Sequence, residues 1–356
     1  MSEQIKFRIG ILGCGFIVSD CHLPSYEKLG FLPVAIASRT GSKAAEVAAR
    51  FGIPKVHESC EVLLDDRSIE VLDIAVPPQF QPELIRQACE RGTVKAILAQ
   101  KPLALDLETA QDLVERCEKA GILLAVNQNM RFDPSVKKAN ELLAAGELGG
   151  AVFATIDMRG IPHWQPWQAE TGGATMKIMS IHHLDCMRFW FGDPERVFCS
   201  LRPDPRTEFP HEDGICTYVL EYACGLRTVI VDDVWTGPAR EGCPEDIGIT
   251  WRIEGLDGLA IGDIGWCKDP YTSPSGMRWA KKGDTSFREE KLEGSWFPDA
   301  FGGTMGEVLA ALREKRSCTL AGRDNLRTLA LIEAACVSVK EKRSVALEEI
   351  FKKHSI

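Results

Sequence analysis

The first third of the chain alternates short, largely apolar runs with longer amphipathic segments, and this alternation limits the fold more than any other feature. Largely apolar runs, rather than alternating ones, are typical of parallel strands that helices cover on both faces. The predicted strands are Ile9–Leu12, Pro33–Ala37, Val71–Val76, Val94–Leu98 and Ile122–Val126. The predicted helices between them include Ser42–Phe51, Glu83–Arg91 and Leu107–Ala120. Such an alternation predicts an α/β domain built on a doubly wound parallel sheet.

A glycine-rich turn joins the first predicted strand to the helix behind it. It has Gly13 and Gly15 at the first two positions of a G-x-G-x-x-G pattern and Val18 at the third. Gly13 permits the tight turn, and Gly15 lets a pyrophosphate approach the backbone at the helix N-terminus, where Phe16 and Ile17 begin the helix. Because the turn lies between a predicted strand and a predicted helix, it indicates a dinucleotide-binding domain.

The end of the second predicted strand bears on the choice of cofactor, because the ribose next to adenine binds there in such domains. An acidic residue at this position would bond both ribose hydroxyls and favour NAD(H). The chain has Ser38 and Arg39 instead, and a hydroxyl and a guanidinium suit a 2′-phosphate. We therefore expect NADP(H). NAD(H) stays open, because Arg39 would stack on adenine in either cofactor.

The bulk composition excludes several classes of partner. The 356 residues carry a formal net charge of −9, whereas nucleic acids and anionic membranes bind basic surfaces. No run of about 18 apolar residues occurs, and the polar N-terminus has no signal-peptide pattern. The 13 cysteines are scattered without a C-x-x-C pair, so we expect no metal site and a reducing compartment. These features predict a cytoplasmic protein with a small-molecule substrate.

Motifs along the whole chain resemble those of the glucose–fructose oxidoreductase / inositol dehydrogenase / rhizopine catabolism (Gfo/Idh/MocA) family. Besides the glycine turn, they are His22-Leu23-Pro24, Val76-Pro77-Pro78, Gln100-Lys101-Pro102, Asn129–Pro134, Gly172-Gly173-Ala174, His182–Asp185 and Ala321–Leu326. The resemblance implies a Rossmann domain over residues 1–126. It also implies an α+β domain over residues 127–356, with a large, open and mostly antiparallel sheet for substrate binding and oligomerisation.

The sequence of the second domain agrees with this expectation. Predicted strands include Ala151–Asp157, Ile215–Glu221, Leu226–Val231 and Ile249–Ile253, and helical patterns fall over Asp133–Ala145 and Ser180–Trp190. Because an open sheet face needs cover, we expect a homodimer or a homotetramer.

Lys101 is the strongest candidate for a catalytic residue. It leaves the carboxyl end of a predicted parallel strand, where ligands of such sheets bind, and Pro102 fixes the backbone after it. Burial can lower the pKa of a lysine into a useful range. The resemblance makes His182 a proton acceptor, and Asp185, three residues later on the same helical face, could orient its ring. We expect His183 to be structural.

Further site residues are assigned, some from their place in the predicted fold and some from the resemblance. The assigned cofactor-binding residues are Gly13, Gly15, Phe16, Ile17, Ser38, Arg39, Pro77, Gln100, Lys101 and Asn129. The assigned substrate-binding residues are Lys101, Arg131, Arg159, His163, Trp164, Lys177 and His182. The segment 159–167 looks like a loop over the active site, in which indoles stack on sugars. The competing interpretation places Trp164 and Trp167 in a domain or subunit interface.

Three positions depart from the family pattern. Ile178, next to Lys177, stands where relatives usually carry an aspartate one helical turn before the histidine. Gln100 replaces a glutamate, and Gln81 replaces a histidine. The loss of the carboxylate at position 178 removes one partner for substrate hydroxyls or for a relay between Lys101 and His182, whereas it leaves the fold and the cofactor site unaffected.

These observations predict an NAD(P)-dependent oxidoreductase that transfers a hydride between nicotinamide and a hydroxyl or keto group of a sugar, sugar acid or inositol. Two alternatives use the same fold. A lyase or isomerase would oxidise a sugar, transform it and reduce it again without net change in the cofactor, and the missing carboxylate favours this alternative. A non-catalytic sugar or dinucleotide sensor would need neither Lys101 nor His182.

Overall fold

The computed structural model describes residues 7–160, 165–234, 248–265 and 274–356. The chain divides into two compact units. Unit 1 comprises residues 1–128 and 301–326, and unit 2 comprises residues 129–300 and 327–356. The predicted site residues His163 and Trp164 lie outside the described residues.

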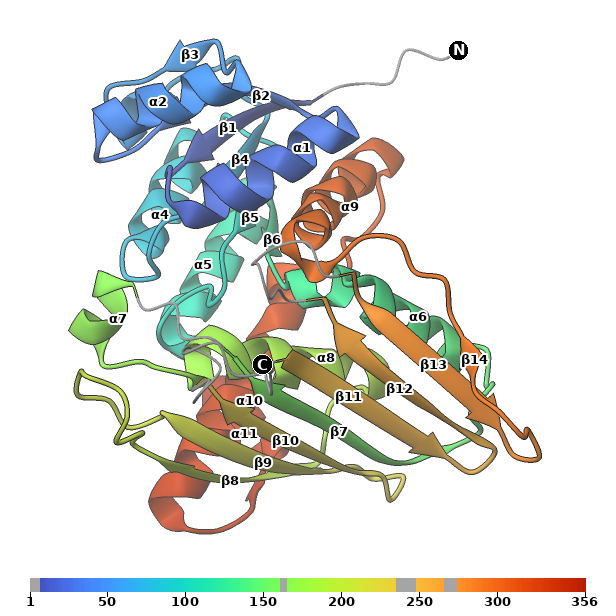
Figure 1. The fold of residues 1–356 in the computed structure, drawn as a ribbon. Coiled ribbons are helices and arrows are strands. Elements are labelled where there is room, and N and C mark those ends of the chain that lie inside the picture. Colours follow the sequence, from blue (N-terminus) through green and yellow to red (C-terminus); the bar gives the residue numbers. More distant parts are fainter. Residues whose placement is uncertain (1–6, 161–164, 235–247, 266–273) are drawn as a thin grey trace. The chain divides into compact units, whose positions relative to one another are not determined.

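Unit 1 is built on a six-stranded parallel sheet with the strand order β3-β2-β1-β4-β5-β6 (Figure 1). Every residue of β4 and β5 is buried, and all of them are apolar except Asp73 of β4, as expected for parallel strands covered on both faces. The strand order reverses between β1 and β4, and ligands of open α/β sheets bind at such a reversal. The elements up to residue 126 are β1 (Arg8–Leu12), a helical turn (Ile17–His22), α1 (Leu23–Leu29), β2 (Leu32–Ala37), α2 (Gly41–Phe51), β3 (Lys55–Val56), α3 (Cys60–Leu64), β4 (Val71–Ile74), α4 (Gln81–Arg91), β5 (Ala96–Ala99), α5 (Leu107–Ala120) and β6 (Leu123–Val126).

Local sequence signals set the ends of these helices. At the start of α5, the carboxylate of Asp106 accepts a hydrogen bond from the backbone N–H of Thr109, and Gly121 ends the helix in the left-handed conformation. The side of α5 that faces the sheet is apolar, with Leu113 and Val114 in the core. Within the described residues, no helix combines the length and the apolar character that a membrane crossing requires.

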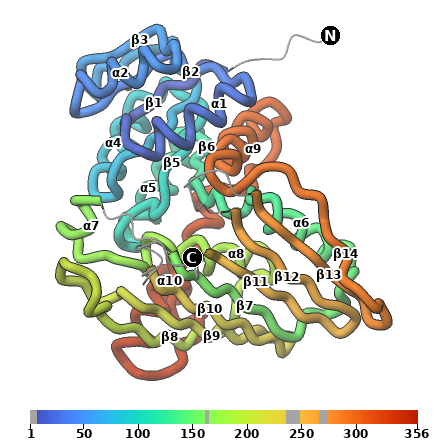
Figure 2. Tube along the Cα trace, in the orientation of Figure 1, coloured from blue at the N-terminus to red at the C-terminus, as the bar shows by residue number. Residues whose placement is uncertain are grey.

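A segment from the far end of the chain completes unit 1. Helix α9 (Phe301–Glu314) packs against α1 and β5, and Figure 2 shows it in orange beside the blue α1. After it, the backbone N–H of Val126 donates to the carbonyl of Leu320 at 2.9 Å, and Ala321 forms a bridge with Ala125 at the edge of β6. The sequence predicted one uninterrupted second domain over 127–356. The structure differs, because these contacts tie residues 301–326 to the parallel sheet.

Unit 2 contains a nine-stranded sheet with the order β14-β13-β12-β11-β7-β10-β9-β8-β15. Only β7 and β10 pair in parallel, and the other neighbours are antiparallel, as expected for the second domain. Its elements are a helical turn (Asn129–Phe132), α6 (Pro134–Ala144), β7 (Ala151–Arg159), α7 (Pro166–Thr171), a helical turn (Met176–Ser180), α8 (Ile181–Phe191), β8 (Arg196–Arg202), β9 (Ile215–Glu221), β10 (Arg227–Asp233), β11 (Gly248–Gly255), β12 (Gly258–Ile264), β13 (Gly276–Lys281), β14 (Arg288–Glu289), a turn (Trp296–Ala300), β15 (Val345–Ala346) and α11 (Leu347–His354); α10 (Gly322–Glu341) runs from unit 1 into unit 2.

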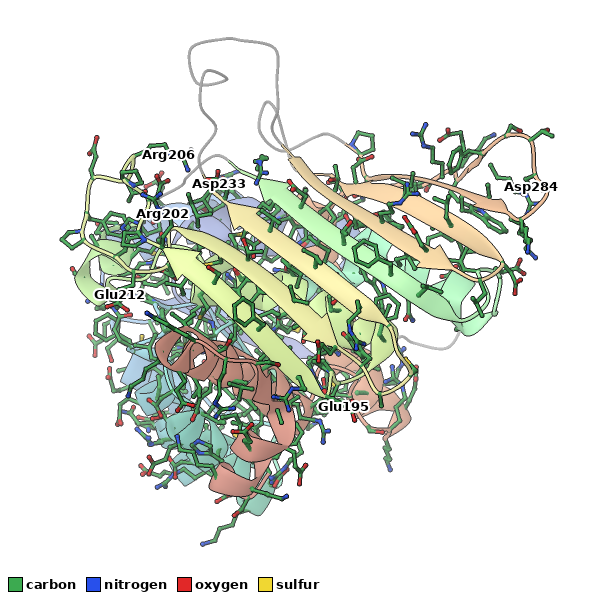
Figure 3. All side chains as sticks on the ribbon, turned by 90° about the horizontal axis from the view of Figure 1, so that it is seen from below. Glu195, Arg202, Arg206, Glu212, Asp233 and Asp284 are labelled. Carbon is green, nitrogen blue, oxygen red and sulfur yellow. The ribbon has the colours of Figure 1, made fainter. Side chains whose placement is uncertain are left out.

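The two faces of this sheet differ in their cover. Helix α6 packs on β12 and β13, and α8 packs on β10, so this face holds the core of unit 2. Along β9 and β10 the side chains alternate between buried and partly exposed. Figure 3 looks onto the other face, where the outward side chains of the strands are in view and no described helix crosses them. The open sheet that the sequence predicted is therefore present.

Candidate active site

The glycine turn draws three strand ends of unit 1 together. The backbone N–H of Gly13 donates to the carbonyl of Ala37, at the end of β2, over 2.9 Å. Gly13 has a φ of 114°, and a Cβ at this position would lie 2.2 Å from the carbonyl oxygen of Ala75, which follows β4. No side chain fits there, so the fold itself requires glycine at position 13.

Gly15 has a different reason to be glycine. Its φ lies outside the left-handed region, and a Cβ built on it would meet nothing within 4 Å. Phe16 and Ile17 follow it, and the backbone N–H of Val18 closes the helical turn on the Gly15 carbonyl at 2.9 Å. The turn leaves an open cradle at the start of a helix, where backbone N–H groups bind anions. The residues present thus fit the pyrophosphate of a dinucleotide.

The predicted adenosine end of the cofactor site lies just after β2. Ser38 is partly exposed and Arg39 is exposed. The guanidinium of Arg39 lies 4.7 Å from the ring centre of Phe80, which stands at the start of α4 and is itself 42% exposed. Pro77, in the loop after β4, accepts the backbone N–H of Phe80. This stacking holds one face of the arginine.

Lys101 lies in the segment that leaves β5, as predicted. The desolvation of its ammonium lowers the pKa of Lys101 to about 8. Below this pH the side chain is a cation, and above it the side chain is a neutral amine that accepts a proton. The amide of Gln81 holds the backbone on both sides of Lys101 through hydrogen bonds to Gln100, Pro102 and Leu103. Lysine at this strand end can therefore exchange a proton near neutral pH.

A buried polar network supports the same strand ends. Nδ1 of His22 lies 2.6 Å from Oδ2 of Asp73, which also accepts from the hydroxyl of Tyr26 at 2.9 Å. Nε2 of His22 lies 3.0 Å from the side-chain nitrogens of Gln100 and Asn127. Because both amides donate to Nε2, the ring carries its proton on Nδ1, towards Asp73. The network fixes the side chain of Gln100 immediately before Lys101.

His182 occupies the buried N-terminal part of α8 in unit 2, with 3% of its surface exposed. The indole of Trp296 meets its ring edge-on, with the ring centres 5.4 Å apart. Trp296 in turn donates its Nε1–H to Oδ1 of Asn129 over 2.7 Å. The contact with a large rigid ring limits the rotation of the imidazole. Asn129, predicted to bind the cofactor, thus anchors the tryptophan beside His182.

Asp185 does not orient the ring of His182, and this interpretation from the sequence is wrong. Its two carboxylate oxygens accept from Nε and a terminal nitrogen of Arg131, at 2.6 and 2.8 Å, and from the hydroxyl of Thr328 at 2.7 Å. A buried carboxylate needs a cation, and Arg131 supplies it in the geometry of a planar fork. Arg131, predicted to contact the substrate, is 9% exposed and engaged in this pair.

His183 is structural, as expected. Its side chain is fully buried, and Nδ1 lies 2.6 Å from Oδ1 of Asp232 on β10. The pair ties α8 to the sheet of unit 2.

The residues before His182 form a turn that Asp213 holds in place. The carboxylate of Asp213 accepts from the backbone N–H groups of Ala174, Thr175 and Met176 at 2.7–3.0 Å. Lys177 and Ile178 follow in this turn and are both partly exposed. The carboxylate that the family pattern leads one to expect at position 178 is replaced by an apolar side chain, one helical turn before His182.

The remaining predicted substrate residues lie at the end of β7. Arg159 is its last residue, about a third of its side chain is exposed, and its guanidinium lies 3.5 Å from the carboxylate of Asp157. The loop residues that follow, His163 and Trp164, are outside the described part of the chain. In the described ranges, no group of three or more His, Cys, Asp or Glu side chains could hold a metal ion.

Sequence reasoning missed Trp296, although it lies against His182. The tryptophan stands in an irregular segment far from any motif, and only its contact across 114 positions gives it a role. Sequence reasoning likewise treated Gln81 only as a departure from the family pattern. The backbone groups that Gln81 binds lie in the segment after β5, about 20 residues away.

Comparisons with known proteins agree with this geometry. A family model described as "Oxidoreductase family, NAD-binding Rossmann fold" matches residues 7–128, and a model of the GFO/IDH/MocA C-terminal domain matches residues 136–265. The two matches follow the division of the chain into the parallel and the mostly antiparallel sheet.

Similar curated proteins and structures span most of the chain. D-apiose dehydrogenase of Paraburkholderia graminis is 26% identical over 97% of this chain and 91% of its own length. D-xylose 1-dehydrogenase (NADP(+)) 2 of Haloferax volcanii is 28% identical over 77% of this chain and 81% of its own length. An oxidoreductase from Agrobacterium radiobacter, solved in complex with NAD+, L-tartaric acid and magnesium, has the same fold, with a TM-score of 0.84 at 22% identity over 97% of this chain and all of its own.

The contrast between the two glycines gives a test of the cofactor cradle. We expect Gly15→Ala to change the free energy of unfolding by less than about 0.5 kcal/mol, because its Cβ meets nothing. It should weaken binding of the nicotinamide dinucleotide roughly tenfold, the equivalent of one lost hydrogen bond. Gly13→Ala should instead destabilise the fold by more than about 2 kcal/mol. Denaturant unfolding and calorimetric titration measure both quantities, and an unchanged affinity in Gly15→Ala would contradict the assignment.

Proposed function

Because the chain belongs to the Gfo/Idh/MocA family of oxidoreductases with an NAD-binding Rossmann fold, we propose that it is an NAD(P)-dependent dehydrogenase of a sugar, sugar acid or inositol. The observation that carries the proposal is Lys101. A lysine with a pKa lowered to about 8 follows β5 at the same sheet edge as a glycine turn with room for a pyrophosphate.

The proposed reaction uses Lys101 as the acid–base group. When bound, a nicotinamide dinucleotide supplies the acceptor or donor of the hydride. During oxidation, the neutral amine of Lys101 takes the proton of the substrate hydroxyl while the hydride leaves the carbon that bears it. The ammonium formed in this way stabilises the negative charge that develops on the oxygen. During reduction, the same ammonium returns its proton to the carbonyl oxygen.

We propose His182 as a second acid–base residue, and the argument uses only its contacts within unit 2. Its ring is held by Trp296, so its orientation does not depend on the substrate. Arg131 keeps the Asp185 carboxylate engaged, and this pair stabilises the start of α8 below His182. In this proposal Arg131 holds α8 in position and does not contact the substrate. Lys177, in the turn before α8, is the cation that we propose to contact the substrate.

NADP(H) is the cofactor that we propose, with NAD(H) as the alternative. In support, the chain places Ser38 and the exposed Arg39 directly after β2, where it has no acidic residue. Phe80 stacks on one face of the guanidinium and leaves its edge free to bond a 2′-phosphate. The xylose dehydrogenase relative is named for NADP(+), in line with this choice.

For the substrate, we place pentoses first among sugars, sugar acids and inositols. The apiose and xylose dehydrogenases are the relatives that support this order. We also propose that the protein works in the cytoplasm, without nucleic-acid or membrane partners, since its net charge of −9 disfavours polyanionic surfaces.

Replacement of Lys101 tests the proposal directly. We expect Lys101→Met to lower kcat for sugar oxidation by about 10²–10⁴-fold, the usual loss when an acid–base group is removed. In the unmodified enzyme the rate should rise with pH and level off above about 8, because only the neutral amine accepts the proton. The assay follows nicotinamide absorbance with a panel of pentoses, sugar acids and inositols.

Lys95→Met is the matched control for this experiment. Lys95 precedes the same strand and pairs with Glu70 on the surface, so its loss should leave kcat within about twofold. Equal activity of Lys101→Met and Lys95→Met would rule out the proposed base. If NADP(H) binds but no reduced cofactor accumulates with any sugar, the dehydrogenase proposal gives way to the cofactor-recycling lyase or isomerase.

Arg39 gives a separate test of the cofactor preference. Arg39→Ala should raise KM for NADP+ about 10–100-fold, the loss of a charge-assisted hydrogen bond, and change KM for NAD+ far less. Arg50→Ala, which removes a surface arginine of α2, serves as the control. An equal loss for both cofactors would mean that Arg39 only stacks on adenine.

We further propose that a second copy of the chain covers the open face of the nine-stranded sheet, in a homodimer or homotetramer. Phe198, Val219 and Val229 stand opposite one another on β8, β9 and β10, and together form an apolar row on that face. Val219→Glu should yield a monomer by light scattering, because at a twofold contact the new carboxylate would lie close to the same carboxylate of the second copy and repel it. A wild-type monomer would overturn the proposal.

A further inference from the structure

The side chain of Gln81 binds the backbone around Lys101 from a different part of unit 1. Its Nε2 donates to the carbonyls of Gln100, Pro102 and Leu103, at 2.9, 3.2 and 3.0 Å. Its Oε1 accepts from the backbone N–H of Gln100 at 2.7 Å. One amide thus binds four backbone groups just beyond the end of β5, where the N–H of Gln100 also donates to the carbonyl of Ile74 at 3.2 Å.

The position of Gln81 is itself fixed. It is the first residue of α4 and is fully buried, and Pro82 restrains the backbone after it. The orientation of the amide is determined, because a flipped amide would place its oxygen against three carbonyls and its nitrogen against an N–H. The helix therefore offers a rigid base from which one side chain holds the segment.

The segment has a second anchor on its other side. The side chain of Gln100 binds Nε2 of His22, which Asp73 holds through Nδ1. Gln81 fixes the backbone before and after Lys101, and His22 fixes the preceding side chain. Lys101 is thus the residue between two immobilised neighbours, and its own backbone has little freedom.

We propose that Gln81 is a positioning residue, which sets where the Lys101 ammonium stands and limits its contact with water. This inference rests on the proposed function only in so far as Lys101 is the acid–base group of that reaction. Loss of the four hydrogen bonds would let the segment move, and a misplacement of about 1 Å can lower a rate on the order of 100-fold. The amine would then be more exposed to water, and the pKa of Lys101 would rise from about 8 towards the ordinary lysine value.

The test compares Gln81→Met with Gln87→Met. Methionine has nearly the volume of glutamine and no hydrogen-bonding groups, and Gln87 lies on the same helix, where its amide donates to Glu83. The first readout is the pH dependence of the acylation of Lys101 by an amine reagent, followed by peptide mass spectrometry without cofactor. The second is kcat and KM for the sugar at fixed pH.

We expect Gln81→Met to shift the midpoint of acylation upward by at least one pH unit. It should also lower kcat at least tenfold with little change in KM for the cofactor, while Gln87→Met matches wild type. Gln81→His, which keeps one donor and one acceptor, should restore part of both quantities. If Gln81→Met does not fold, Gln81→His and Gln81→Glu carry the comparison, and glutamate keeps only the acceptor.

The inference is overturned if folded Gln81→Met has the acylation midpoint and the kcat of the wild type. This holds even if the variant has a lower melting temperature, because Gln81 would then serve stability alone. Lys101→Met separates this failure from that of the proposed function. If Lys101→Met stays active, Lys101 is not the base, and only the acylation midpoint then tests whether Gln81 positions Lys101. If Lys101→Met is inactive, the acylation midpoint and kcat of Gln81→Met both test it.

Discussion

The close approach of three backbones at Gly13 is the constraint on which unit 1 depends. The turn after β1 passes so near the carbonyl of Ala75 that no Cβ fits, and its N–H bonds the carbonyl of Ala37. The ends of β2, β1 and β4 are thereby joined at the point where the strand order reverses. Everything that we assign to the cofactor, from Gly15 to Arg39, and the loop that leads to Gln81 starts from this junction.

Buried polar pairs then determine which side chains remain available for chemistry. His22 and His183 each lie 2.6 Å from a buried aspartate, and Arg131 holds Asp185 in the same way. A buried charge without such a partner would cost several kcal/mol, so these groups are committed to structure. At Lys101, desolvation lowers the pKa to about 8, so this side chain can exchange a proton near neutral pH.

The sequence was sufficient to predict the parts of the fold that depend on local pattern. Apolar runs and turn glycines are local, and they led to the parallel sheet, the dinucleotide turn and the strand end that carries Lys101. Partners far apart in the chain were not predictable in this way. Helical spacing suggested that Asp185 faces His182, yet its carboxylate binds Arg131, 54 residues away. The role of Gln81 was hidden for the same reason, since it binds the backbone of a segment about 20 residues on.

The return of residues 301–326 to unit 1 has a consequence for how this architecture can be recombined. The cofactor-binding unit is not a cassette at the N-terminus, because α9 and the bridge between Ala321 and Ala125 belong to it. If only residues 1–128 were exchanged with a relative, α1 and β5 would come from one protein and α9 from the other. Their packed interface would then be mismatched. Grafting a different unit 1 onto unit 2 of this chain therefore requires two transplanted segments and three junctions in the chain.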